Sequence, residues 1–187
     1  MDTTEVLAEI LRQGLEDVAV FGIFDPSAVQ AMVAAGVGNS VTVALGGKLP
    51  MPALRQQSRP LDVTGRVKLI ADGDFPATVA MSRGLTMRMG TTAVLSLPGN
   101  VDVVVISRHI EPFDPGCFTS LGIDPRTRRY VMLKSRIHYR VGFRKLARAI
   151  VECAGRGVCT SDYSELEFRN VRRPIFPLDA GVNTRHR

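Results

Sequence analysis

The opening of the chain alternates between helix-like and strand-like patterns of apolar positions. Residues 2–11 begin with a candidate capping box, Asp2 and Glu5, and continue with apolar positions at helical spacing, which predicts an amphipathic helix. Residues 17–24 are almost continuously apolar and predict a buried strand. The Asp-Pro pair at 25–26 then predicts a second helix, because it combines an N-cap with proline at the first helical position.

A strand expected over 40–45 completes an α-β-α-β order, which is typical of a layered α/β unit. Residues 48–60 contain three prolines and predict a loop. Helical periodicity is then lost, and short apolar runs separated by glycine-containing turns predict an antiparallel β meander. The strands expected in this meander are 61–70, 78–81, 85–89, 93–97 and 101–106.

The remaining residues return to mixed helix and strand patterns. The apolar run 130–133 predicts a buried strand, and a stripe of apolar residues from Tyr139 to Ile150 predicts a helix after it. Residues 158–187 lack periodicity and predict an irregular tail. The expected fold class is therefore α/β (α+β): a layered α/β core with an inserted antiparallel β meander and an irregular C-terminal tail. We expect a single domain over 1–179, with 180–187 disordered.

Composition and charge narrow the class of protein. Apolar residues make up 45% and charged residues 22% of the chain, as in soluble globular proteins, and no apolar run reaches the roughly 20 residues of a membrane helix. The acidic N-terminus is not a signal peptide, and three cysteines without CxxC spacing fit reduced thiols, so we expect a cytoplasmic protein without a membrane partner. The net charge of +6 favours an anionic ligand or an acidic domain interface. Nucleic acid is not the expected partner, because the arginines are scattered and tryptophan is absent.

The richest candidate chemistry lies at the junction between the strand and the helix predicted around residues 130–150. Lys134 could bind a carboxylate, while His138 and Arg140 lie in the first turn of the helix, where they can hold an anion or carry a proton. Ser135 is favoured as a helix N-cap. The alternative interpretation of the whole turn is an ion-paired structural element, and the residue types alone do not decide between the two.

A second candidate is the Gly46-Gly47-Lys48 loop, which follows a predicted strand and could hold an anion or simply form a tight turn. It is not a Walker A loop, because Thr42 and Leu49 stand where that motif needs Gly and Ser or Thr. The histidines are far apart without paired-ligand spacing, and no G-x-S-x-G motif is present. We therefore expect no complete metal site and no catalytic residue within this chain.

Three blocks of sequence, in their order and spacing, resemble one known family. They are GGK at 46–48, DPGCFTSLGIDPRTRRYVMLKSRIHYRVGF at 114–143 and RRPIFPLD at 172–179. Together they resemble the C-terminal domain of the MlrC-like (microcystinase C) metallopeptidase family. The resemblance runs from about residue 3 to 179, and departs from the family pattern at 153–157.

The resemblance implies a parent hydrolase that cleaves peptide-like amide bonds and carries its zinc ligands in a larger N-terminal domain. That domain is absent here, so we expect a fragment or stand-alone remnant, inactive alone, whose partners are the metal-bearing domain and a peptide-like or anionic small-molecule ligand. The substrate-binding residues that the resemblance implies are Lys134, Ser135, His138, Arg140, Gly46, Gly47 and Lys48. The alternative function is a stand-alone anion-binding module that uses the Lys134–Arg140 turn and the GGK loop.

Overall fold

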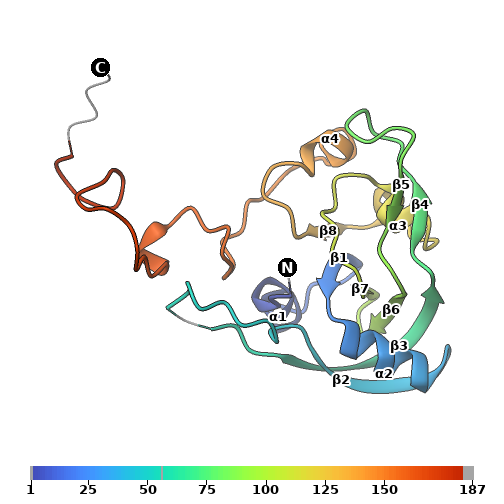
Figure 1. Ribbon diagram of the computed structural model, residues 1–187. Helices are drawn as coiled ribbons and strands as arrows, with labels where there is room; N and C mark the ends of the chain where they lie inside the picture. The colour runs from blue at the N-terminus through green and yellow to red at the C-terminus, as the bar shows by residue number, and fades with distance from the viewer. Residues whose placement is uncertain (1, 56, 183–187) are drawn as a thin grey trace.

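A six-stranded mixed sheet organises the protein. The computed structural model describes residues 2–55 and 57–182, and its strands run in the order β2-β3-β6-β7-β1-β8 (Figure 1). Strand β1 pairs in parallel with β7 and β8, whereas β2, β3, β6 and β7 pair antiparallel. Of these antiparallel strands, β3, β6 and β7 belong to the predicted meander, and β2 was expected in the α/β unit. The strands of this sheet are β1 (Val18–Phe24), β2 (Ser40–Leu45), β3 (Leu61–Ala71), β6 (Thr92–Leu97), β7 (Val101–Ile106) and β8 (Tyr130–Leu133).

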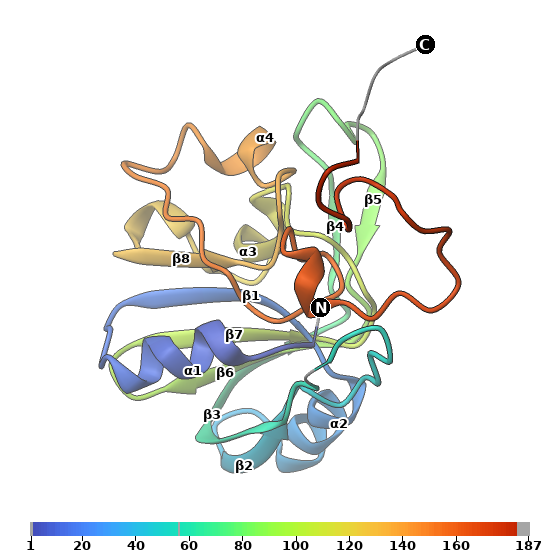
Figure 2. The same ribbon diagram turned by 90° about the vertical axis from the view of Figure 1, so that its left-hand side faces the viewer.

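Both faces of the sheet are covered. On one face, α1 (Glu5–Arg12) and α2 (Pro26–Ala35) bury their apolar sides against β1, β7 and the curled β2–β3 pair (Figure 2). On the other face lie the short helices α3 (Gly116–Thr119) and α4 (Arg140–Phe143) and a hairpin of β4 (Asp74–Pro76) and β5 (Thr86–Arg88). A 3-10 turn, η1 (Pro125–Thr127), leads into β8. The expected class, α/β (α+β) with a meander, is thus confirmed, and the meander is continuous with the parallel strands. The strand expected over 85–89 is not part of the meander, because β5 pairs only with β4 in a separate sheet.

Three strands match their predicted bounds closely. Every residue of β7 is buried, and β2, β7 and β8 begin and end where the apolar runs do. The Asp25 carboxylate caps α2 by accepting the Ala28 N–H, as predicted. The prediction for β8 is wrong in one respect, because this strand was expected to be buried. It is an edge strand that pairs only with β1, so Tyr130 remains 37% exposed.

The helix predicted from Tyr139 to Ile150 is wrong in length. α4 ends at Phe143, and Leu146 and Ile150 are 40% and 44% exposed. Only Tyr139 and Phe143 reach the core, where Phe143 packs edge-on against Phe118 at 6.2 Å between ring centroids. A short helix without packing along its length is marginal in water, so the apolar stripe alone does not continue it.

Two smaller predictions also fail. Residues 78–81 form a turn instead of a strand, because the Asp114 carboxylate accepts the backbone N–H groups of Thr78 and Val79 and holds them away from the sheet. The capping box is not formed either, since the N-cap of α1 is Thr4 without a side-chain bond and Asp2 binds elsewhere.

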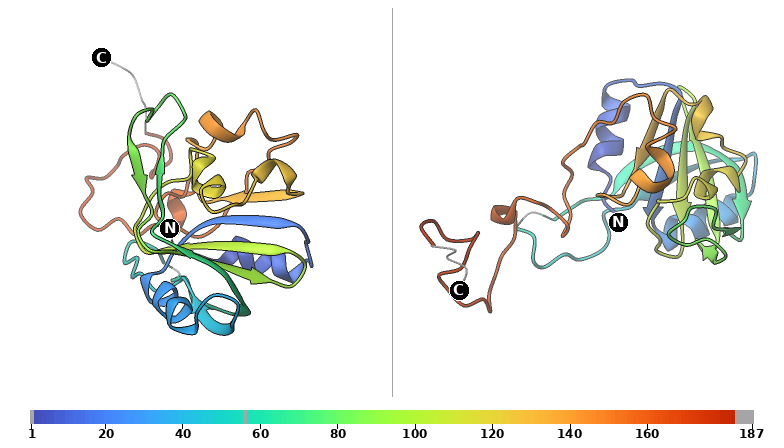
Figure 3. Two further views of the ribbon diagram at one scale, coloured as in Figure 1. Left: turned by 90° about the vertical axis from the view of Figure 1, so that its right-hand side faces the viewer. Right: turned by 90° about the horizontal axis from the view of Figure 1, so that it is seen from above.

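The C-terminal tail is irregular, as expected, and projects from the core. Together with the loop that follows β2, residues 158–182 form what we call the arm, comprising 51–55, 57–59 and 158–182 (Figures 1 and 3). Its two segments pair through a bridge between Leu54 and Leu166, and the tail contains one 3-10 turn, η2 (Tyr163–Glu165). Residues 183–187, most of the stretch expected to be disordered, lie outside the described residues. No helix in the described part of the chain is long and apolar enough to cross a membrane.

Candidate functional site

The parallel strands β1 and β8 deliver their C-terminal residues to one edge of the sheet. Lys134 follows β8, and its N–H donates to the Phe21 carbonyl of β1 at 3.1 Å. Asp25 follows β1, and its N–H donates to the Ile106 carbonyl of β7 at 3.0 Å. In open α/β sheets this edge is where ligands usually bind, and the predicted Lys134–Arg140 turn lies there.

Lys134 holds the N-terminal segment of the chain. Its Nζ donates to both the carbonyl and the hydroxyl of Thr3, each at 2.7 Å. Burial lowers the pKa of Lys134, although the nearby carboxylates of Glu5 and Asp2 oppose this shift. Since Thr3 is only 5% exposed, the ammonium is committed to a buried internal contact.

The GGK loop is a tight turn that binds anions, and those anions belong to the same chain. The Asp2 carboxylate accepts the N–H groups of Lys48 and Leu49 at 2.7 Å, and the Gly47 N–H donates to the Asp2 carbonyl at 2.8 Å. Gly46 has φ of +58°, and a Cβ there would lie 2.0 Å from the Asp2 carbonyl oxygen, so only glycine fits. Both interpretations of the loop, tight turn and anion holder, therefore apply to its internal contacts.

The Asp25 carboxylate completes this internal network. It accepts the Gly46 N–H and the Lys48 ammonium, both at 2.8 Å, in addition to its capping bond. Burial alone would raise the pKa of Asp25, but the hydrogen bonds from Lys48, Ala28, Ser27 and Gly46 outweigh it, so the pKa lies below its ordinary value. Hydrogen bonds thereby connect the residue after β1, the loop after β2 and the N-terminal segment.

A separate cluster forms around the carboxylate of Glu111, in the loop after β7. Glu111 Oε1 accepts the hydroxyl of Ser135 at 2.5 Å, and Glu111 Oε2 lies 2.8 Å from Nδ1 of His138. Ser135 Oγ also accepts the Tyr139 N–H at 3.1 Å, so it closes the turn before α4 without being the N-cap of that helix. The structure thus brings Ser135 and His138 together through a residue that the sequence did not single out.

Packing behind the turn fixes the distance between the Glu111 loop and α4. A Cβ on Gly142 would lie 2.3 Å from the Phe113 carbonyl oxygen, so this glycine lets the helix approach the loop closely. Tyr139 and Phe143 are 8% and 5% exposed and anchor α4 in the core. The polar cluster therefore lies on closely packed residues. His138 itself is about half exposed, at 48% of its side chain.

Arg140 lies apart from this cluster. Its guanidinium pairs with the exposed Glu152 carboxylate and lies over the Tyr139 ring, 5.4 Å from the centroid. Tyr139, Arg140, Arg144, Ile150 and Glu152 line a shallow hollow of about 430 Å³. His138 and Arg140 are thus bonded to carboxylates from different segments, and the expectation that they share one crevice remains a prediction.

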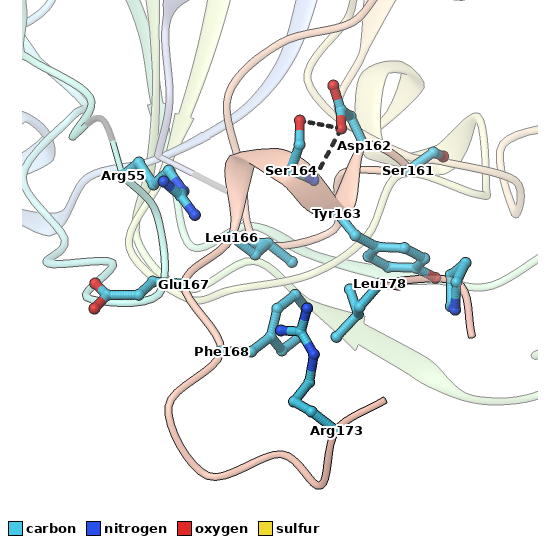
Figure 4. A pocket seen from close by; sticks show the side chains of 11 residues that line it. Arg55, Ser161, Asp162, Tyr163, Ser164, Leu166, Glu167, Phe168, Arg173 and Leu178 are labelled. Atoms are coloured by element: carbon cyan, nitrogen blue, oxygen red, sulfur yellow. Dashed lines mark hydrogen bonds between the residues drawn. The ribbon is translucent and has the colours of Figure 1, made fainter. Parts of the chain in front are cut away.

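A larger hollow of about 620 Å³ lies within the arm, away from the turn (Figure 4). Leu166 and Phe168 form its apolar wall, Arg173 points along it, and Ser164 is bonded to Asp162 beside it. None of the residues predicted to bind substrate lines this hollow.

Metal-ligating groups do not gather at the site. Across residues 2–55 and 57–182, no three His, Cys, Asp or Glu side chains are arranged to hold a metal ion. His109 packs edge-on against Phe24 at 5.6 Å between centroids, and burial lowers its pKa. The described residues therefore do not by themselves fit the zinc that the family resemblance implies.

Sequence reasoning missed Glu111 and the role of Asp2. Glu111 lies in the loop five residues after β7, a fully buried strand that ends at Ile106, and a carboxylate in the loop after such a strand was the signal that could have identified it. No local signal could have placed Asp2 on the GGK loop, because the contact joins residues 46 positions apart.

Comparison with known proteins identifies the family. The family model described as "MlrC C-terminus" matches residues 1–170. The chain belongs to this family. It is 27% identical to Microcystinase C of Sphingomonas sp over 179 aligned residues. The aligned residues make up 95% of this chain and 32% of that protein.

A crystal structure described as that of a candidate metallopeptidase from Mesorhizobium sp. BNC1 has the same fold. Its TM-score is 0.81 at 23% identity, over 95% of this chain and 34% of the other. The chain thus spans about a third of the length of both relatives.

Proposed function

We propose that this MlrC C-terminus domain forms one wall of the substrate cleft of a metallopeptidase-like hydrolase. The single observation that carries the proposal is the Glu111–His138 pair at the C-terminal edge of the parallel strands, in which Nδ1 of the half-exposed histidine lies 2.8 Å from the carboxylate. Together with Arg140, His138 provides donors for a carboxylate or carbonyl oxygen of a peptide-like ligand. Ser135 supports the turn from behind.

We propose a structural role for four of the predicted substrate-binding residues: Lys134, Gly46, Gly47 and Lys48. Their hydrogen bonds to Thr3, Asp2 and Asp25 support a role in building the wall and fixing the N-terminal segment, in place of direct ligand contact. This arrangement gives a stand-alone anion-binding module little support, because Lys134 and the donors of the GGK loop already have partners within the chain.

A metal-bearing domain is the partner we propose opposite this wall, and zinc is the metal we expect it to hold. The described residues do not fit a metal ion by themselves, and both relatives are about three times as long as this chain. The chain alone is then not catalytic, and peptide degradation is the work of the assembled protein. Its three free cysteines favour a reducing compartment, and we place the protein in the cytoplasm.

The arm is the surface we assign to contact with that domain. Exposed apolar side chains gather on it, and apolar patches of this kind mark interaction surfaces. They are Val158, Tyr163, Phe168, Val171, Ile175 and Phe176. The structural match extends over 95% of the chain, so most of the arm is aligned with a segment of a much longer protein.

Chemical-shift mapping tests the cleft wall. A linear peptide with a free C-terminal carboxylate should shift the backbone amides of 135–140, and the same peptide with an amidated C-terminus should shift them less. Arg140→Ala should weaken binding about tenfold, because a charge-assisted hydrogen bond contributes roughly 1.5 kcal/mol.

Arg148→Ala is the matched control, since it removes an equal charge from an exposed position further along the same segment. Binding should survive this change. Shifts confined to the arm, or equal losses in both variants, would contradict the assignment of the wall to the turn.

A further inference from the structure

The imidazole of His138 has its two nitrogens in different surroundings. Nδ1 faces the Glu111 carboxylate at 2.8 Å, whereas Nε2 has no hydrogen-bond partner among the described residues. The nitrogen that carries the proton in neutral histidine is set by the hydrogen bond that the other nitrogen makes. A carboxylate can only accept, so Nδ1 must donate, and the lone pair is then left on Nε2.

Glu111 is itself held in place, which makes it more than a chance surface partner. Its second oxygen accepts the Ser135 hydroxyl at 2.5 Å, and Ser135 Oγ accepts the Tyr139 N–H. Tyr139 is 8% exposed, so this chain of bonds ends in the core. The hydroxyl proton of Ser135 is committed to Glu111, which makes Ser135 a supporting group and not a nucleophile.

We propose that Glu111 is a positioning residue that fixes His138 as the Nδ1–H tautomer and presents Nε2 to the ligand. In the neutral ring Nε2 then carries the lone pair, and in the imidazolium form Nε2–H donates a hydrogen bond to a ligand oxygen. The role in ligand binding rests on the proposed function, but the tautomer does not. The same pattern, in which a carboxylate orients a histidine from behind, recurs wherever a histidine must offer one nitrogen in a defined direction.

Two variants separate positioning from general loss of structure. Glu111→Ala removes the acceptor, and His138 should shift toward the Nε2–H tautomer that free imidazole side chains prefer. Glu111→Gln keeps an oxygen that can accept from Nδ1, and should retain the Nδ1–H tautomer. Glu152→Ala is the matched control, because Glu152 is the carboxylate that pairs with the neighbouring Arg140.

The experiment is ¹⁵N NMR of the histidine rings in the whole chain, with His109 as internal reference, followed by titration with the free-carboxylate peptide. We expect the Nδ1–H tautomer in the wild type and in Glu152→Ala, its loss in Glu111→Ala, and about fivefold weaker peptide binding in Glu111→Ala. An Nε2–H tautomer in the wild type, or no change in Glu111→Ala, would overturn the positioning role.

The outcomes also distinguish this inference from the proposed function. A changed tautomer in Glu111→Ala with unchanged peptide affinity would overturn the presentation of Nε2 to the ligand while leaving the cleft wall in place. If the wild type binds no peptide, the proposed function fails, and the tautomer alone decides whether Glu111 positions His138. Amide spectra of each variant must overlay outside 107–143, which excludes loss of fold as the cause.

Discussion

Replacing Asp102 with alanine is expected to lower the free energy of unfolding by about 4 kcal/mol. The Asp102 carboxylate is fully buried in β7 and pairs with Lys68 at 2.6 Å and Arg128 at 2.5 Å. Removing it leaves Lys68 without its partner and Arg128 with only the longer ion pair to Asp17, at 3.6 Å. Because Arg128 is only 10% exposed, water does not readily replace its lost contact. Arg128 stands just before β8 and also donates to the Asn100 carbonyl, so the change should loosen the strand that carries the candidate site.

Urea unfolding monitored by circular dichroism measures this loss. Asp124→Ala is the matched control, because Asp124 also pairs with an arginine but does so at the surface, where ion pairs contribute little. The control should lose much less stability than Asp102→Ala. Equal losses in the two variants would show that the buried cluster does not anchor the start of β8.

Replacing Asp25 with alanine should cost about 3 kcal/mol at neutral pH and should also flatten the acid dependence of stability. Asp25 is 3% exposed, and its loss removes the cap of α2 and leaves the Gly46 N–H and the Lys48 ammonium without their acceptor. Hydrogen bonds hold its pKa below the ordinary value of 3.8 in the folded protein.

The sign of the pH effect follows from that lowered pKa. The unfolded chain binds a proton at Asp25 more readily than the folded chain, so this contribution is fully present above about pH 4 and is lost as the pH falls through the folded pKa. The wild type should therefore lose stability below pH 4 more steeply than Asp25→Ala. Parallel stability curves for the two proteins would contradict the network that joins β1, the GGK loop and the N-terminal segment.

The parts of the fold predicted from sequence are those specified by local signals. β2, β7 and β8 could be read from their apolar runs, and the Asp25-Pro26 pair marked the start of α2 correctly. The helix predicted over 139–150 failed because apolar spacing states which face would be buried but not whether a core exists to bury it. The turn at 78–81 failed because a carboxylate 35 residues away holds its backbone.

The candidate site shows the same limit. The sequence located the Lys134–Arg140 turn, because the change from strand to helical pattern and the clustered polar residues are local. It could not show that Lys134 would bind Thr3, 131 residues earlier, or that Glu111 would bind His138, 27 residues later. Side chains that looked equivalent in the sequence are therefore divided between a buried contact, at Lys134, and partly exposed pairs with carboxylates, at His138 and Arg140.

The most direct test of the central claim, that this domain is a cleft wall without the metal centre, is the zinc content of the purified chain measured with its peptide hydrolysis. The chain should be dialysed against zinc, its bound metal quantified by mass spectrometry, and hydrolysis of linear peptides followed with and without a chelator. We expect to find well below one zinc ion per chain and no hydrolysis that a chelator abolishes. One tightly bound zinc per chain with chelator-sensitive hydrolysis would contradict it.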